Sequence, residues 1–294
     1  MEKMKFSRSF SAEKPRLFAG LLAAAFAATL LLIAGSFTSL SPNSPFLCST
    51  SAVGGSDDGK SKDPTPPQME AILHYATSRT VPQQSLAEIS VSAAVLRSLG
   101  PCRFLVFGLG HDSLMWTGLN PRGTTLFLEE DPRWVHSILR RFPNLLRSRV
   151  VRYPTRLHQA DSLLSSYKDE PDCLLGGSHG LAHLKGNARC KLALSTLPSE
   201  VYEDEWDVIM IDAPRGYFPD APGRMAAIYT AAVMARGRTH HGVTHVFLHD
   251  VNRRVERVYA EEFLCKKYLV KAVGRLWHFE IPSFVGNGNF TSFC

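Results

Sequence analysis

Apolar residues along the chain form two kinds of stretch, and together these predict an alternation of strands and helices. Four short apolar runs are typical of buried strands: residues 103–108 (RFLVFG), 124–130 (TTLFLEE), 206–212 (WDVIMID) and 244–250 (THVFLHD). Strands that are apolar on both faces belong to a parallel sheet covered by helices on both sides. We therefore expect an α/β fold with a doubly wound sheet.

Helices can be placed from their apolar faces and their end signals. One is expected at about residues 83–99 and ends at Gly100. The residues on its apolar face are Leu86, Ile89, Ala93 and Leu96. Another begins after Asp112, and a third opens with Asp131 as N-cap and Pro132 in the first turn. The apolar face of that third helix comprises Trp134, Val135, Ile138, Leu139 and Phe142.

The C-terminal part departs from this alternation. Residues 268–281 (YLVKAVGRLWHFEI) have a turn at Gly274 and place Trp277, Phe279 and Ile281 on one face of a strand. This pattern predicts an antiparallel hairpin at the edge of the sheet. A doubly wound sheet with such a hairpin is the expected layout of a class I (Rossmann-like) methyltransferase and is less typical of a dinucleotide dehydrogenase.

The N-terminal part indicates a membrane anchor. Residues 17–37 carry no charge, and about 20 apolar residues suffice to cross a bilayer as a helix. Basic residues outnumber acidic ones in residues 1–16, which predicts a cytoplasmic tail and a lumenal remainder, the type II topology. The alternative is a cleaved signal peptide that ends near Ala34. Residues 38–67 are rich in Ser, Pro and Gly and read as a disordered stem, so the folded domain is expected at 68–294.

Six cysteines follow the predicted anchor, and an even number in an oxidising lumen permits disulfides. We expect one bridge between Cys173 and Cys190, with buried free thiols as the alternative. The chain has no CxxC pair, which argues against a zinc site of that kind. A sequon at Asn289 fits a lumenal location. The net charge of +6 favours an acidic partner: nucleic acid, an anionic membrane or an acidic polysaccharide.

Ligands of open parallel sheets bind outside the carboxyl ends of the strands, so residues just after each strand are the candidate site residues. The turn of Gly108 and Gly110 follows the first strand and allows a ligand to approach the backbone closely. A carboxylate about 20 residues later is placed to bind a ribose, and Glu129 is the first choice with Glu130 as the alternative. Ser113 stands where a dinucleotide fingerprint has its third glycine, which favours S-adenosylmethionine over a nicotinamide cofactor. The expected donor-binding residues are Gly108, Gly110, His111, Asp112, Glu129 and Glu130.

Two later strands end in groups suited to acid and base chemistry. Methyl transfer from a sulfonium needs a base for the proton of the acceptor hydroxyl, and the candidates are Asp212, His249 and Asp250. Arginines in the same loops would pair with a substrate carboxylate. The candidate acceptor-binding residues are Arg215, Tyr217, Arg224 and Arg253. The alternatives are helix caps for the aspartates and ordinary surface charges for the arginines. A divalent metal on Asp212, Asp250 and Asn252 is possible but is not predicted.

Five sequence blocks, in this order, resemble a plant family: residues 102–116, 124–135, 206–236, 244–256 and 261–279. The family is that of the Golgi glucuronic-acid 4-O-methyltransferases, and the chain looks closest to its arabinogalactan branch. Xylan enzymes of the family tend to read Asn-His-Gly-Gly-Arg-Thr where this chain has NPRGT at residues 120–124. The resemblance implies a Golgi lumenal enzyme, S-adenosylmethionine as donor, and glucuronic acid of a cell-wall polysaccharide as acceptor.

Our hypothesis is therefore a type II Golgi membrane enzyme that methylates the 4-hydroxyl of glucuronic acid on arabinogalactan. Glucuronoxylan is the alternative acceptor. A non-catalytic scaffold of the same fold is the alternative from another class. No nucleic-acid partner is expected.

Overall fold

The computed structural model describes residues 63–175, 184–240, 242–284 and 292–294 of the 294-residue chain. The expected tail, anchor and most of the expected stem lie outside the described residues, as do Cys48 and the sequon at Asn289. None of the helices in the described ranges is long and apolar enough to cross a membrane.

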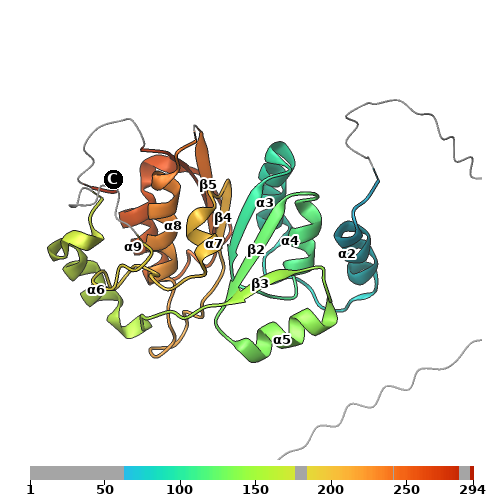
Figure 1. Ribbon diagram of the computed structural model, residues 1–294, viewed down its shortest axis with the longest axis horizontal. Coiled ribbons are helices and arrows are strands. Elements are labelled where there is room, and N and C mark those ends of the chain that lie inside the picture. Colours follow the sequence, from blue (N-terminus) through green and yellow to red (C-terminus); the bar gives the residue numbers. More distant parts are fainter. Residues whose placement is uncertain (1–62, 176–183, 241, 285–291) are drawn as a thin grey trace, which may run out of the picture. The chain divides into compact units, whose positions relative to one another are not determined.

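A seven-stranded sheet in the order β3-β2-β1-β4-β5-β7-β6 forms the centre of the domain (Figure 1). The strands are β1 (Arg103–Phe107), β2 (Thr124–Glu129), β3 (Arg147–Val150), β4 (Val208–Ile211), β5 (Val243–Leu248), β6 (Leu269–Val273) and β7 (Leu276–Pro282). β1 to β5 are parallel, whereas β7 is antiparallel to β5 and to β6. The four predicted strands and the predicted hairpin are confirmed. β3 was not predicted, because its sequence RSRV is largely exposed and lacks an apolar run.

Helices cover both faces of the sheet, as expected for a doubly wound fold (Figure 1). On one face lie α2 (Pro66–Thr77), α3 (Leu86–Leu99), α4 (Ser113–Leu119) and α5 (Pro132–Arg141). On the other lie α6 (Ala160–Ser166), α7 (Ser199–Glu203), α8 (Met225–Gly237) and α9 (Arg254–Tyr259). Short 3₁₀ turns at Leu157–Gln159, Tyr167–Asp169, Pro171–Cys173 and Lys266–Tyr268, and a π-helical turn at Ala260–Leu264, complete the second layer.

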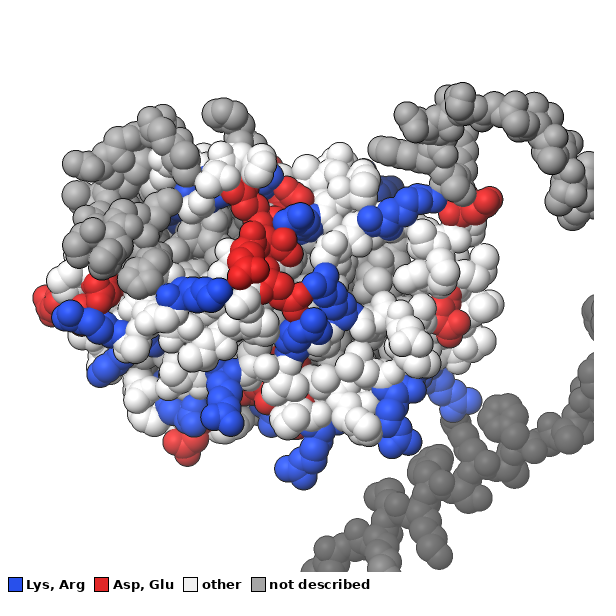
Figure 2. All heavy atoms as spheres, viewed as in Figure 1, with Lys and Arg blue, Asp and Glu red and all other residues white. Residues whose placement is uncertain are grey.

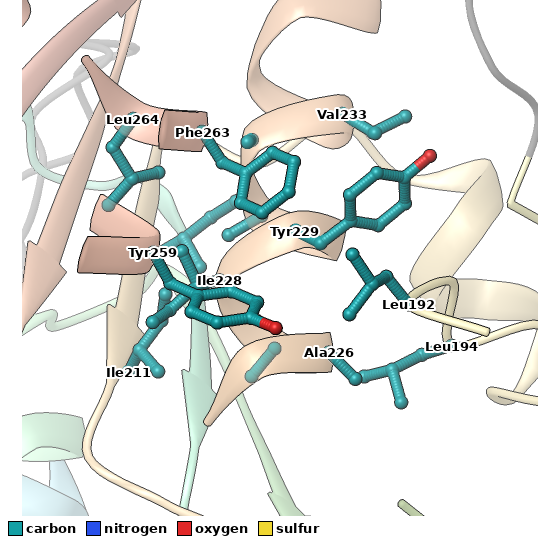
Figure 3. Close-up of a cluster of buried hydrophobic side chains, with 14 of the residues drawn as sticks. Leu192, Leu194, Ile211, Ala226, Ile228, Tyr229, Val233, Tyr259, Phe263 and Leu264 are labelled. Carbon is teal, nitrogen blue, oxygen red and sulfur yellow. The ribbon is translucent and has the colours of Figure 1, made fainter. Parts of the chain in front are cut away.

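Alternate residues of each inner strand contribute to two separate hydrophobic cores. In β1, Leu105 and Phe107 pack under α8 and its neighbours, while Phe104 and Val106 pack under α3 and α4. Figure 3 shows the first core, where Tyr229 and Ile228 of α8 lie between side chains of the loop before α7 and those of α9 and the π-helical turn. Both faces of the strands are thus buried, which explains the continuous apolar runs.

The predicted apolar face of α3 is partly wrong. Leu86 is 80% exposed, whereas Glu88 and Ser92 are buried beside Leu96. The helix begins at Ser85, whose hydroxyl accepts a hydrogen bond from the Glu88 amide, and the Glu88 carboxylate accepts hydrogen bonds from the Ser85 amide and hydroxyl. This capping box sets the start of the helix and turns Glu88 inward. The predicted cap of α5 is confirmed, since Asp131 accepts hydrogen bonds from two backbone amides.

Two disulfides lie among the described residues. The predicted bridge between Cys173 and Cys190 is confirmed. A second bridge joins Cys265 to Cys294, and Cys102 is a buried free thiol. The described cysteines therefore agree with an oxidising compartment.

Candidate active site

A cavity of about 570 Å³ opens at the carboxyl ends of β1, β2, β4 and β5. The turns after these four strands meet there, as expected for an open parallel sheet. The predicted site residues that line it are Gly108, Gly110, His111, Asp112, Glu129, Glu130, Asp212, Arg215, Tyr217, Arg224, Asp250 and Arg253. His249 alone among the predicted residues does not line it: its side chain is 1% exposed and lies behind Asp212.

The backbone amides of the glycine turn after β1 are already hydrogen-bonded to other groups of the protein. The amides of Gly108, Leu109 and Gly110 donate to the Leu128 carbonyl, the Glu129 carboxylate and the Ser113 hydroxyl, respectively. A pyrophosphate site of the dinucleotide type needs such amides free for the ligand. The turn itself requires glycine at position 108, because Gly108 has a φ of +125° and a Cβ on it would lie 3.1 Å from the Ala213 Cβ.

Glu129 joins the first two turns of the site. One of its carboxylate oxygens accepts the Leu109 amide at 3.1 Å, and the other accepts the amides of Glu130 and Asp131 at 2.8 and 3.1 Å. Glu129 lines the cavity, and among the described residues its first oxygen accepts this one hydrogen bond, which leaves capacity for a ribose hydroxyl. Glu130 lies beside it, and burial followed by the charge of Glu129 raises its pKa.

Asp112 and Asp212 face the same cavity and have opposite pKa shifts. Burial and the charge of Asp212 raise the pKa of Asp112 to about 6, although its carboxylate accepts a hydrogen bond from the Trp116 indole at 2.8 Å. Burial alone would raise the pKa of Asp212, but the hydrogen bond from His249 and the charge of Arg224 outweigh it and lower the pKa. Two carboxyl groups with divergent pKa values are typical of acid–base sites.

Behind Asp212 lie two buried side chains, those of His249 and Glu88. Nδ1 of His249 lies 2.9 Å from Oδ1 of Asp212, and its Nε2, which has no hydrogen-bond partner among the described residues, lies 3.8 Å from Oε1 of Glu88. Burial would raise the pKa of Glu88, but hydrogen bonds from Ser85 and Arg275 outweigh it and lower the pKa. The imidazole thus lies between the carboxylates of Asp212 and Glu88.

Arg224 pairs with the protein and has little capacity left for a ligand. Its Nε donates to the Pro214 carbonyl and its Nη1 to the His249 carbonyl. Its Nη2 donates to the backbone carbonyl and the carboxylate of Asp212 and, at 2.9 Å, to Asp250. The side chain is 5% exposed. The arginine therefore holds the two strand-end carboxylates in place.

Asp250 is also fully paired. One of its oxygens contacts Arg224 and Arg253, both at 2.9 Å, and the other contacts Arg275 at 2.7 Å. Asp212, by contrast, has a side chain 22% exposed to the cavity. Of the three predicted bases, Asp212 is thus the one whose carboxylate an acceptor can reach.

Arg215 and Tyr217 lie at the rim of the cavity. The Arg215 side chain is 53% exposed and lies 3.8 Å from Glu130 and 3.7 Å from Asp131, distances that leave its guanidinium open to another carboxylate. Tyr217 is 68% exposed and its ring packs edge-on against Phe218. Exposed cationic and aromatic groups at a rim suit a sugar acid.

Sequence reasoning missed three residues of this site. Gln84 donates to Asp212 at 3.1 Å, Glu88 lies behind His249, and Arg275 pairs with Asp250. Gln84 precedes α3 and Glu88 belongs to it, so neither residue follows a strand in the sequence. The Ser85-x-x-Glu88 pattern was the available signal, since a capping box marks a helix start. The position of the Glu88 side chain beside His249 could not be predicted from the sequence.

Asp212, His249 and Asp250 also offer ligand atoms within 4.8 Å of one another, close enough to hold a metal ion. The guanidinium of Arg224 already lies 3.2 Å and 2.9 Å from the two carboxylates. Asn252, the third ligand considered from the sequence, is exposed and is not part of this group.

Comparisons with known proteins bear on this site. The model of the IRX15/IRX15L/GXM family matches residues 87–279, a range that includes every lining residue except those of segment 80–83. The chain is 55% identical over 282 residues to Arabinogalactan O-methyltransferase 1 of Arabidopsis thaliana, covering 95% of this chain and 96% of that protein. It is 52% identical to Arabinogalactan O-methyltransferase 2 of the same plant, with coverage of 96% and 94%. Identity to its Glucuronoxylan 4-O-methyltransferase 1 is also 52%, but over 215 residues and 73% of each chain.

Proposed function

The chain belongs to the IRX15/IRX15L/GXM family, and from this premise we propose that it is an O-methyltransferase that acts on a plant cell-wall polysaccharide. The proposed reaction transfers a methyl group from S-adenosylmethionine to the 4-hydroxyl of glucuronic acid. The sheet with its C-terminal hairpin supports this, because it has the layout expected of a class I methyltransferase. The observation that carries the proposal is the cavity at the strand ends, where the Asp212 carboxylate, the accessible one among the predicted bases, lies beside the glycine turn.

The acidic cavity wall fits a cationic donor. S-adenosylmethionine supplies a methyl group on a positively charged sulfonium and also carries an ammonium group. Asp112 and Asp212 provide negative charge at the cavity, and Glu129 keeps a lone pair for a ribose hydroxyl. Gly108 and Gly110 permit close approach, and the cavity lies within the usual range of about 300 to 1,000 Å³ for such ligands.

Asp212 acts as the proton acceptor in this proposal. As the acceptor oxygen bonds to the methyl carbon and the carbon–sulfur bond breaks, the hydroxyl proton passes to the Asp212 carboxylate. His249 orients that carboxylate through the hydrogen bond at its Nδ1, and Glu88 lies on the other side of the imidazole. Arg224 and Gln84 hold Asp212 from other sides. His249, Arg224 and Asp250 are therefore positioning residues, which revises the roles first expected for them.

We place the acceptor at the rim of the cavity because an exposed positive charge lies there. Arg215 has the exposed guanidinium that a uronate carboxylate can pair with, and Tyr217 offers a ring for a sugar face. Arabinogalactan is favoured over glucuronoxylan because similarity to the arabinogalactan enzymes extends over nearly the whole chain. The NPRGT segment carries no weight here, because Arg122 and Thr124 lie at the amino ends of the strands, away from the cavity.

We further propose a type II location in the Golgi membrane. The support is the uncharged stretch at 17–37, the basic residues before it, and the lumen-compatible disulfides.

The test of the proposed chemistry compares two aspartates that follow β4. Asp212→Asn should lower kcat by about 10² to 10⁴, the usual contribution of a positioned base, whereas donor affinity should fall less because Asp112 keeps its charge at the cavity. Asp220→Asn is the matched control, because Asp220 is exposed and lies outside the cavity lining. Donor binding is measured by calorimetry in parallel. Absence of both donor binding and turnover in the unmodified protein would favour the scaffold alternative.

A further inference from the structure

A second cluster of side chains with metal-binding chemistry lies on β5 and β7. His278 and Glu280 are two residues apart on β7, so their side chains share one face of the sheet. His245 of β5 lies directly opposite Glu280 in the antiparallel register. Cross-strand neighbours and i, i+2 neighbours on one face are close enough for their side chains to meet.

The three ligand atoms lie at distances suited to one ion. Nδ1 of His245 lies 3.0 Å from Nε2 of His278 and 3.7 Å from Oε1 of Glu280, and all three atoms lie within 4.8 Å of one another. Around a tetrahedral zinc ion, with bonds of about 2.0 to 2.1 Å, ligand atoms are roughly 3.3 Å apart. The two separations from His245, 3.0 and 3.7 Å, lie on either side of that spacing.

The imidazoles are oriented and uncharged, as metal ligands must be. The His278 ring stacks on Phe247 with centroids 4.3 Å apart, and the two histidine rings stack at 5.2 Å. Burial followed by the nearby His245 lowers the pKa of His278 to about 4, and burial also lowers the pKa of His245. Both rings are therefore neutral at physiological pH.

We propose that His245, His278 and Glu280 form a binding site for a divalent transition-metal ion, with Zn²⁺ as its representative. Two imidazoles and one carboxylate are borderline ligands that suit zinc, and the 42% exposure of Glu280 leaves room for water as a fourth ligand.

The ion would join β5 to the C-terminal hairpin. β7 is held to the sheet through β5, and β6 only through β7, so a link between His245 and His278 secures both hairpin strands. The site lies toward the amino end of β5, whereas His249 and Asp250 follow its carboxyl end. Its expected role is therefore structural, and it is separate from the donor cavity.

The test is a calorimetric titration of the full-length chain in detergent with Zn²⁺. The unmodified protein should bind the ion, and Zn²⁺ should raise its Tm. His278→Gln and Glu280→Gln should each weaken binding about 100-fold, the upper end of the loss seen when even indirect partners of a metal are removed. Glu280 is half exposed, so its variant keeps the packing intact and tests the site even if His278→Gln fails to fold.

Two control variants locate the ion. His240→Gln should bind Zn²⁺ normally, because His240 is exposed and pairs with Glu205 outside this cluster. The Asp212→Asn variant should also bind Zn²⁺ normally, because Asp212 belongs to the separate group with His249 and Asp250 at the donor cavity. Absence of binding to the unmodified protein would overturn the proposal. So would binding that survives Glu280→Gln and His278→Gln, or binding that is lost with Asp212→Asn.

Discussion

At the scale of single residues, the site depends on how each charge is paired. Arg224 and Arg215 both follow β4 and both line the cavity, yet their surroundings differ. Arg224 is buried among the carboxylates and carbonyls it contacts, whereas Arg215 is half exposed and loosely paired. Because both residues are arginines in the same loop, the sequence alone could not distinguish their roles. Burial and partners, which depend on the tertiary fold, distinguish the positioning residue from the candidate ligand.

The two arginines should therefore respond differently to truncation. Arg224→Ala leaves Asp212 and Asp250 without their shared partner, and removal of one member of a buried ion pair costs about 3 to 5 kcal/mol. Arg215→Ala should change the free energy of unfolding by less than about 0.5 kcal/mol but raise the KM for a glucuronic-acid acceptor. Urea unfolding and acceptor kinetics check both. A stable Arg224→Ala variant with a selective defect in acceptor binding would contradict these roles.

Asp112 should make donor binding depend on pH. Its pKa of about 6 means that much of it is protonated below pH 6, and a cationic donor favours the carboxylate form. Donor binding should therefore lower this pKa, release a proton near pH 5.5, and weaken as pH falls below 6. Calorimetry in buffers of different ionisation enthalpy measures the proton release. Asp112→Asn should abolish that release, and an unchanged release would show that another group titrates.

At the scale of elements, the sequence identified what depends on local pattern. The four inner strands, the hairpin at Gly274 and the Asp131 cap were predictable, because buried strands and caps have characteristic residues. Strand β3 was not, since an exposed edge strand needs no apolar run. The face of α3 that packs on the sheet was predicted wrongly, because Glu88 is on it. Glu88 is buried because it accepts hydrogen bonds from Ser85 and Arg275, and an apolar pattern does not reveal such a residue.

The loop between α6 and α7 should depend on its disulfide. Cys173 and Cys190 are 17 residues apart, and closing a loop of about that length in the unfolded chain stabilises the fold by about 3 kcal/mol. The double variant Cys173→Ser/Cys190→Ser should lose approximately that stability in denaturant unfolding. Cys102→Ser is the comparison, because that thiol forms no disulfide. Equal stability of the double variant and the unmodified chain would contradict the prediction.

At the scale of the whole molecule, the site is the meeting point of four strand ends and the segment before α3. The topological rule for parallel sheets located most lining residues from the sequence, because it needs only the strand ends. It could not place Gln84 and Glu88, which contact Asp212 and His249 behind the cavity through the packing of α3 on the sheet. Figure 2 shows acidic side chains gathered near the middle of one face of the domain. Glu203, Glu205 and Arg238 line a hollow at the amino ends of the strands, opposite the donor cavity.

The most direct test of the central claim incubates the full-length chain with labelled S-adenosylmethionine and three separate acceptors. These are de-methylated arabinogalactan, glucuronoxylan and a galactan free of uronate, each offered also to Asp212→Asn. We expect label on the 4-hydroxyl of glucuronic acid in arabinogalactan, no label on the galactan, and a loss of at least about 100-fold with the variant. Label on none of the polymers, or equal labelling by Asp212→Asn, would contradict it.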